Sequence, residues 1–301
     1  MPKSTKRIKC YYYQLAVVSD APDHQDRIFE FNKWMMKRPP KDEMKQHVQL
    51  NGCIAYIDDL HISGEGRYYF VRFYRLRTEN LPARIREGEK AEPIQLNDGE
   101  YIGNDLNMLY DCKTGFAMVQ RNYLSLTTSR LSEWMSRDFD SGERVAFRPI
   151  FQKLRLQRMK KKEVRSIELS LANLDTVDYN GSSSLNSLLH GFEKYQGYTA
   201  KIKISVGKKK GQSLDTGSIE DLLTDTYCNQ DIVEGGTVKL REEGKPNIES
   251  VDIFNDAISD EMQIEVANNS GSADFYAMET KMLATYKERV DELKKCAGLE
   301  K

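Results

Sequence analysis

Two parts of the sequence each contain a pair of strand-like runs joined by a short turn. Residues 52–63 and 67–77 are rich in aromatic and β-branched side chains, which favour strands, and they flank Gly-Glu-Gly at 64–66. Residues 104–122 show the same pattern on either side of Cys-Lys-Thr-Gly at 112–115. A turn this short can join only antiparallel neighbours. These runs therefore predict an antiparallel sheet as the framework of the chain.

The remaining segments alternate between strand and helix patterns. Further strand-like runs lie at 8–18, 141–151, 164–172, 200–206, 236–243 and 260–269, and helical apolar spacing occurs at 26–38, 125–139, 180–195, 216–227 and 272–297. We therefore expect an α+β fold with mostly antiparallel sheets, packed helices, two domains and a long C-terminal helix. Apolar side chains form one stripe along that last helix, which suits either a core or a dimer contact. The stripe comprises Phe275, Met278, Met282, Tyr286, Val290 and Leu293.

Length and composition favour two ordinary domains in a chain of 301 residues. We predict that residues 1–152 together with 248–301 form a globular α+β domain, and that residues 153–247 form a second, basic α+β domain. With 39% hydrophobic and 30% charged residues, the chain has material for a core and an ionised surface. No apolar run approaches the roughly 18 residues of a membrane helix, and the N-terminus lacks the apolar stretch of a signal peptide. We therefore expect a cytoplasmic protein.

Few sequence patterns point to catalysis. The five cysteines are widely spaced and the four histidines lie outside metal-ligand spacing, so neither a disulfide framework nor a zinc site is indicated. Neither a nucleophile elbow nor a P-loop occurs, and the run GKKKGQS has the wrong glycine spacing for the latter. We therefore expect a protein that has no cofactor and is not an enzyme.

The charges are distributed unevenly along the chain. Residues 144–213 contain 15 Lys or Arg against 5 Asp or Glu, whereas residues 214–301 contain 9 against 20. A basic block of this kind fits a surface that binds a polyanion, because clustered cations make salt-dependent phosphate contacts. It fits equally well two solvated faces that pair with each other. Composition alone leaves both interpretations open.

One region of the sequence carries motifs of a known family. These are TGFA at 114–117, TTSRL at 127–131 and SGERV at 141–145, followed by a strand that ends in Pro149 and Ile150. In this order and spacing the chain resembles RexA, the soluble component of a two-protein phage-exclusion system of lambdoid prophages. The resemblance extends more loosely to the lysine-rich segment at 201–210 and to the closing helix.

The resemblance implies a non-catalytic, DNA-binding homodimer with a globular domain and a second, mobile domain. It also implies a sensor of a phage DNA intermediate that activates a membrane-channel partner of the RexB kind. The family's DNA-contacting positions lie in the basic cluster that follows the strand matched by 201–206. By location, Lys203, Lys208, Lys209 and Lys210 correspond to them in this chain.

The lysines of this segment also form a pattern of their own. Along the predicted strand at 200–206, Ile202 and Ile204 face one way, while Lys201 and Lys203 face the other. Lysines on a loop supply phosphate contacts rather than base readout, so we predict sequence-tolerant binding to double-stranded DNA. The candidate DNA-binding residues are Lys153, Arg155, Arg158, Lys160, Lys161, Lys162, Lys201, Lys203, Lys208, Lys209 and Lys210.

Two other classes of function compete with DNA binding. The first is a metal-dependent nuclease of a phage defence or counter-defence system, in which Asp252 and Asp256 would be metal ligands. The second is an adaptor that binds another protein through the closing helix and uses the basic run against an acidic partner.

Overall fold

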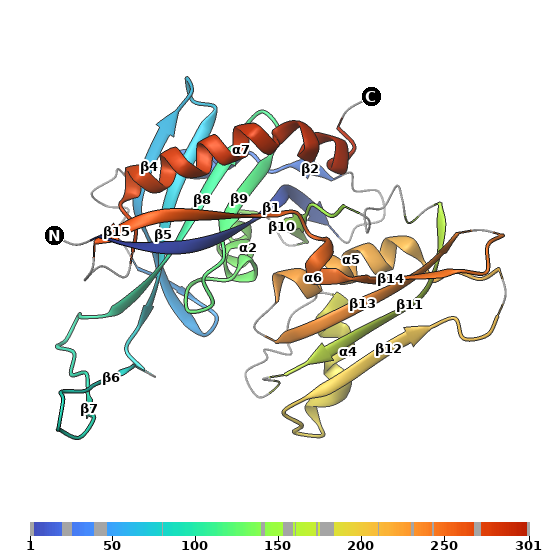
Figure 1. Cartoon of the computed structure of the whole chain (residues 1–301), viewed down its shortest axis with the longest axis horizontal. Helices are drawn as coiled ribbons and strands as arrows, with labels where there is room; N and C mark the ends of the chain where they lie inside the picture. The colour runs from blue at the N-terminus through green and yellow to red at the C-terminus, as the bar shows by residue number, and fades with distance from the viewer. Residues whose placement is uncertain are drawn as a thin grey trace.

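The structure is a computed structural model in which two antiparallel sheets lie side by side (Figure 1). The larger sheet has nine strands and the smaller has four. We call them the large sheet and the small sheet. The structure describes residues 3–19, 26–38, 47–79, 81–139, 142–152, 159, 161–172, 174, 184–209, 211–229, 232–242, 244–267 and 272–299.

The large sheet is organised around its long first strand. Seven strands follow the order β10-β1-β9-β8-β5-β4-β3, and β2 and β15 also pair with β1. The first half of β1 pairs with β15 and its second half with β10, so strands far apart in the sequence are neighbours in one sheet. The strands are β1 (Lys3–Ser19), β2 (Arg27–Ile28), β3 (Val48–Leu50), β4 (Cys53–Ser63), β5 (Tyr68–Arg77), β8 (Ile102–Asp111), β9 (Phe116–Gln120), β10 (Glu143–Pro149) and β15 (Ser259–Ala267).

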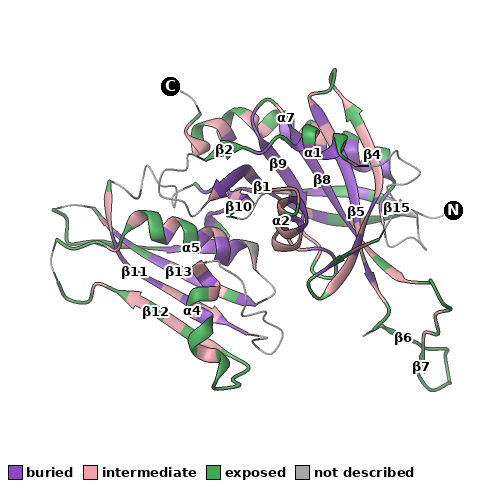
Figure 2. Ribbon diagram, turned by 180° about the vertical axis from the view of Figure 1, so that it is seen from behind, coloured by how far each residue is buried: buried purple, intermediate pink, exposed green. Residues whose placement is uncertain are grey.

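Both predicted hairpins are present in this sheet. Strands β4 and β5 pair from Ser63↔Tyr68 outward, and β8 and β9 pair from Asp111↔Phe116 outward. The connection between β5 and β8 protrudes from the sheet and contains a short strand pair, β6 (Ala83–Arg84) with β7 (Glu92–Pro93) (Figures 1 and 2). The α+β prediction with mostly antiparallel sheets is confirmed.

Helices cover the large sheet on both faces (Figures 1 and 2). Helices α1 (Phe31–Met36) and α2 (Thr128–Ser136) bury Trp34, Leu131 and Met135 against one face. Thr127 and Thr128 are the two candidate caps at the start of the helix predicted at 125–139. Thr127 caps α2, because its side chain accepts the N–H of Arg130 at 3.3 Å. The long helix α7 (Phe275–Ala297) lies across the other face.

The apolar stripe of α7 belongs to the core. Phe275, Met278, Met282, Tyr286 and Leu293 are buried against strands of the large sheet, and Val290 is partly buried beside them. Of the two roles that the stripe allowed, the core role is therefore confirmed. The stripe is not available as an exposed dimer contact.

The described helices that pack on the small sheet lie on one of its faces (Figures 1 and 2). Its strand order is β12-β11-β13-β14, and buried residues such as Leu185 and Leu223 join its helices to the core. The elements are β11 (Lys162–Leu171), α4 (Ser184–Glu193), β12 (Ala200–Ser205), α5 (Thr216–Cys228), β13 (Val233–Glu242), β14 (Ile248–Asp252) and α6 (Ile253–Asp256).

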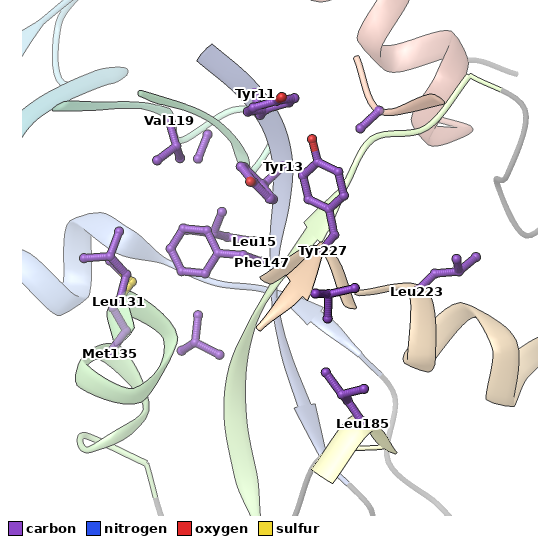
Figure 3. Close-up of a cluster of buried hydrophobic side chains, with 14 of the residues drawn as sticks. Tyr11, Tyr13, Leu15, Val119, Leu131, Met135, Phe147, Leu185, Leu223 and Tyr227 are labelled. Carbon is purple, nitrogen blue, oxygen red and sulfur yellow. The ribbon is translucent and has the colours of Figure 1, made fainter. Parts of the chain in front are cut away.

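One continuous apolar core connects the two sheets (Figure 3). At the junction, the ring of Tyr227 on α5 lies 5.4 Å from that of Tyr11 and 5.9 Å from that of Phe151. The small sheet also reaches beyond the predicted boundary at residue 247, since β14 pairs with β13. A five-residue edge strand gives little periodicity to detect in the sequence. Separate domains and the mobility of the second one remain predictions.

Among the described residues, no helix is long and apolar enough to cross a membrane.

Candidate nucleic-acid interface

Six of the eleven predicted DNA-binding residues lie within the described part of the chain. They are Lys161, Lys162, Lys201, Lys203, Lys208 and Lys209. Five of the six belong to the small sheet or to its β12–α5 connection, and Lys161 directly precedes β11. The remaining five lie outside the described residues: Lys153, Arg155, Arg158, Lys160 and Lys210.

Lys201 and Lys203 lie on the face of the small sheet that none of the described helices covers, which we call the open face. Along β12, the exposed lysines alternate with the half-buried Ile202 and Ile204, as predicted. Both lysines contact one carboxylate from the neighbouring strand β11: Lys201 Nζ is 2.7 Å from Glu168 Oε1, and Lys203 Nζ is 3.5 Å from Glu168 Oε2. The hydrogen bond from Lys201, supported by Lys203, lowers the pKa of Glu168 below its ordinary value. Two predicted cations therefore share one ionised neighbour.

A third lysine on the open face is not among the predicted residues. Lys239 on β13 stands opposite Ser166 of β11 and Ser250 of β14 in the strand register, and it is exposed. No carboxylate among the described residues forms an ion pair with it. The strand at 236–243 was predicted, but its order in the sheet was not, and this order brings Lys239 to the face that carries Lys201 and Lys203.

Lys161 and Lys162 lie at the start of β11 and differ in environment. Lys162 Nζ is 2.8 Å from Glu249 Oε2 on β14, so the acidic C-terminal third neutralises this lysine. Lys161 is exposed, and within the described residues it has no ion pair. The start of β11 is also where the β12–α5 connection packs, because Leu214 N–H donates to the carbonyl of Val164 at 2.9 Å.

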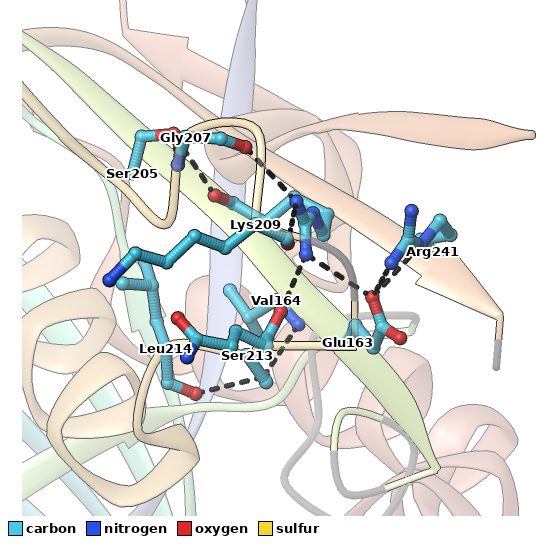
Figure 4. Close-up of polar contacts among 10 residues, drawn as sticks. Glu163, Val164, Ser205, Gly207, Lys209, Ser213, Leu214 and Arg241 are labelled. Atoms are coloured by element: carbon cyan, nitrogen blue, oxygen red, sulfur yellow. Dashed lines mark hydrogen bonds and ion pairs between the residues drawn. The ribbon is translucent and has the colours of Figure 1, made fainter.

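The β12–α5 connection, which we call the lysine loop, spans residues 206–215 and carries the exposed Lys208 and Lys209. Neither side chain has an ion pair in the described part of the chain. Arg165 on β11, only 8% exposed, fixes the loop from below. Its guanidinium donates to the carbonyls of Gln212, Gly207 and Lys209 at 2.6, 3.0 and 2.8 Å (Figure 4). Arg165 therefore ties three of the described loop residues to β11.

A carboxylate completes the surroundings of Arg165. Glu163 Oε2 lies 3.4 Å from Arg165 Nη1 and accepts a 2.9 Å hydrogen bond from Arg241 Nε on β13 (Figure 4). Val164 N–H donates to Ser213 Oγ at 2.9 Å and ties the far end of the loop to the same strand. Val164 and Arg165 of β11 thus contact the lysine loop directly, and Glu163 supports it through Arg165.

Comparison with known proteins gives a family and no named relative. A model of a family of unknown function (DUF6731) matches residues 3–296. The chain belongs to this family. No curated protein and no solved structure matches it. The family description states no activity. DNA binding and the resemblance to RexA therefore remain predictions.

The contacts by which Arg165 supports the lysine loop were not predicted, although the apolar pattern of β11 contains a signal for them. Arg165 is one of the 15 Lys or Arg residues in the basic block at 144–213, but it is not among the candidate DNA-binding residues. In β11 the buried apolar positions are Val164, Ile167, Leu169 and Leu171, so the alternation slips by one residue after Val164. The structure shows a register irregularity at this point. A slip of one residue is the mark of a β-bulge, which redirects a side chain.

The carboxylates proposed for a nuclease do not assemble. Asp252 caps α6 by accepting the N–H of Asn255 at 2.8 Å, and Asp256 is buried. The neighbouring Asp260 holds Arg289 and Tyr12 instead, with Tyr12 Oη at 2.6 Å. Within the described residues, no group of three or more His, Cys, Asp or Glu side chains is placed to hold a metal ion.

A polar cavity of about 170 Å³ lies between β10 and α5 and is lined by two arginines and three aspartates. Arg148 pairs with Asp26 at 2.6 Å. Burial raises the pKa of Asp225, the nearby Arg144 opposes that rise, and the same carboxylate accepts the N–H of Leu185 at 3.2 Å. The cavity thus has no surplus of positive charge for an anion.

Proposed function

We propose that the protein binds double-stranded DNA through the lysine loop and the adjoining open face, as a non-catalytic, sequence-tolerant binder. The observation that supports this most is the pair Lys208 and Lys209, which are exposed, have no ion pair among the described residues and stand on a loop fixed by Arg165. A lysine amine is a point charge without the paired donors that discriminate bases. Phosphates of the DNA backbone are the ligands that it suits.

The ion pairs limit how strongly the described residues can respond to salt. Lys162, Lys201 and Lys203 each contact a carboxylate, whereas Lys161, Lys208, Lys209 and Lys239 have no ion pair in the described part of the chain. If these four meet phosphates, the slope of log K against log salt is about −3 to −4. Affinity for DNA then falls about a hundredfold between 50 and 200 mM salt.

A charge-reversal experiment tests the proposal. The affinity of wild type and of Lys208→Glu with Lys209→Glu for a fluorescent duplex is measured across a salt series. We expect the variant to bind more weakly and its slope to be shallower by about two, since two phosphate contacts are lost. The matched control reverses two exposed lysines away from the small sheet, one in the β6–β7 connection and one on α7, by Lys90→Glu with Lys281→Glu, which changes the net charge equally. Equal slopes for the two double variants would remove the lysine loop from the site.

The biological role that we propose is the sensor of a prophage-encoded phage-exclusion system. The resemblance to RexA at 114–150 supports it, and so does a basic surface suited to DNA of any sequence. In this role the protein acts as a homodimer and signals to a membrane-channel partner. A neighbouring gene for a protein with several membrane helices, required together with this one for exclusion of a superinfecting phage, is the expected finding. Exclusion that persists without that gene would contradict the role.

A further inference from the structure

The Arg165 contacts suggest more than a diffuse positive surface. We propose that the turn carrying Lys208 and Lys209 is a built cradle for one phosphate group, and that Arg165 is the positioning residue that shapes it. This inference rests on the proposed DNA binding. The phosphate that we assign to the cradle is a backbone phosphodiester of the duplex.

Peptide geometry gives the cradle its main-chain donor. In a trans peptide, a carbonyl and the N–H of the next residue point in opposite directions. Because the Gly207 carbonyl points to Arg165 at 3.0 Å, the N–H of Lys208 points away from Arg165. Within the described residues, neither Lys208 N–H nor Lys209 N–H donates a hydrogen bond. Backbone N–H groups of a turn can bind an anion, and the exposed Lys208 and Lys209 add two positive charges to the same turn.

Arg165 shapes this arrangement without contacting the ligand. Its two Nη atoms are engaged by three loop carbonyls and by Glu163, so those donors are already used within the protein. At 8% exposure the guanidinium lies beneath the loop. A lysine at this position would keep the charge, but its single ammonium group cannot match the planar fork that spans the three carbonyls.

Gly207 supplies the second structural requirement. Its φ of 64° is in the left-handed region, which glycine adopts readily. A Cβ there would meet no atom within 4 Å, so an alanine acts only by straining the turn. Gly88, in the protruding β6–β7 connection, has a φ of 81° and equally open space, which makes it a matched control far from the site.

The test compares Arg165→Lys and Gly207→Ala with Gly88→Ala and wild type. We expect Arg165→Lys and Gly207→Ala to bind duplex DNA about tenfold more weakly at a fixed salt concentration, while Gly88→Ala binds as wild type. The salt slope stays at the wild-type value in all of them, because every lysine is still present. Thermal unfolding is measured alongside, and if Arg165→Lys does not fold, Gly207→Ala decides.

Competition with inorganic phosphate separates a shaped cradle from a merely stable fold. At equal ionic strength, phosphate should displace duplex from wild type more effectively than chloride, and Arg165→Lys should lose this excess. Duplexes with 5′-phosphate and 5′-hydroxyl ends should bind equally, and a preference for the 5′-phosphate would overturn the assignment to the backbone diester. Wild-type affinity in both Arg165→Lys and Gly207→Ala overturns the cradle. The DNA-binding proposal still stands in that case if Lys208→Glu with Lys209→Glu binds duplex more weakly than wild type and with a shallower salt slope.

Discussion

The large and small sheets differ in how many of their faces are covered. Helices α1 and α2 pack on one face of the large sheet and α7 on the other, so central strands such as β9 are buried along their whole length. In the small sheet, the described helices pack on one face, and the edge strand β12 alternates between half-buried and exposed residues. A continuous apolar run marks a strand buried on both faces, and alternation marks one with a wet face. The solvent-exposed face of the small sheet, the open face, is therefore the one available for a ligand.

The carboxylates of the two sheets also differ in their exposure to solvent. In the large sheet, Asp111 and Asp260 are shielded and bind α7 through hydrogen bonds to Tyr286 and Arg289. In the small sheet, Glu168 lies on the surface and balances Lys201 and Lys203. Carboxylates of the first kind stabilise packing, whereas the second kind sets how much positive charge the open face presents.

The largest expected effect is on the core under α7. Met282 is fully buried, so Met282→Ala leaves a cavity and should lower the free energy of unfolding by about 2–5 kcal/mol. Ile202→Ala, on the half-buried edge of the small sheet, should cost about 1 kcal/mol because less apolar area returns to water. Urea unfolding measures both, with Met36→Ala as the control, since Met36 is 80% exposed. Similar losses for Met282 and Ile202 would break the contrast between the sheets.

Most of the fold could be predicted from local sequence patterns. The hairpins, the capping of α2 by Thr127 and the alternation along β12 all depend on neighbours within a few residues, and all were predictable. The short strand β14 was not, because five residues at a sheet edge are specified by pairing with β13 rather than by their own periodicity. Strand order was also out of reach, since it depends on contacts distant in sequence.

The candidate site was predictable to the same extent. The sequence identified lysines on one strand face and in one loop, which are local features. It did not identify Glu168 between Lys201 and Lys203, or Glu249 beside Lys162, because these ion pairs join residues far apart in the sequence. Arg165 was missed for a related reason: a bulge in β11 turns its side chain toward a loop more than 40 residues away.

Acid should affect the two sheets differently. Burial alone would raise the pKa of Asp111, but hydrogen bonds from Arg67 and Tyr286 outweigh it and hold the pKa below its ordinary value. Against the effect of burial, hydrogen bonds from Arg289 and Tyr12 lower the pKa of Asp260 in the same way. A lowered pKa stabilises the fold above the unfolded value of about 3.9, and this contribution is lost as the pH falls through the folded pKa. Asp225 on α5 has a raised pKa, so protonation favours its folded state.

Hydrogen exchange across an acid series measures this difference. As the pH falls below about 4, the amides of α7 should lose protection before those of α5. Asp111→Asn with Asp260→Asn removes both titrating groups, so the double variant should start with a less protected α7 and show a weaker dependence on pH. If α5 opens first in the wild type, the assignment of the acid-sensitive contacts to α7 is wrong.

The smallest expected effect concerns the charge balance of the open face. Glu168→Gln removes the carboxylate that Lys201 and Lys203 share, at a position about a third exposed. Exposed ion pairs are weak, so duplex affinity should rise by only about two- to fivefold. Glu261→Gln on β15 is the matched control, because it removes the same charge from an exposed position of the large sheet. If both variants raise the affinity equally, net charge explains the gain, and a selective rise in Glu168→Gln would show that the open face contacts DNA.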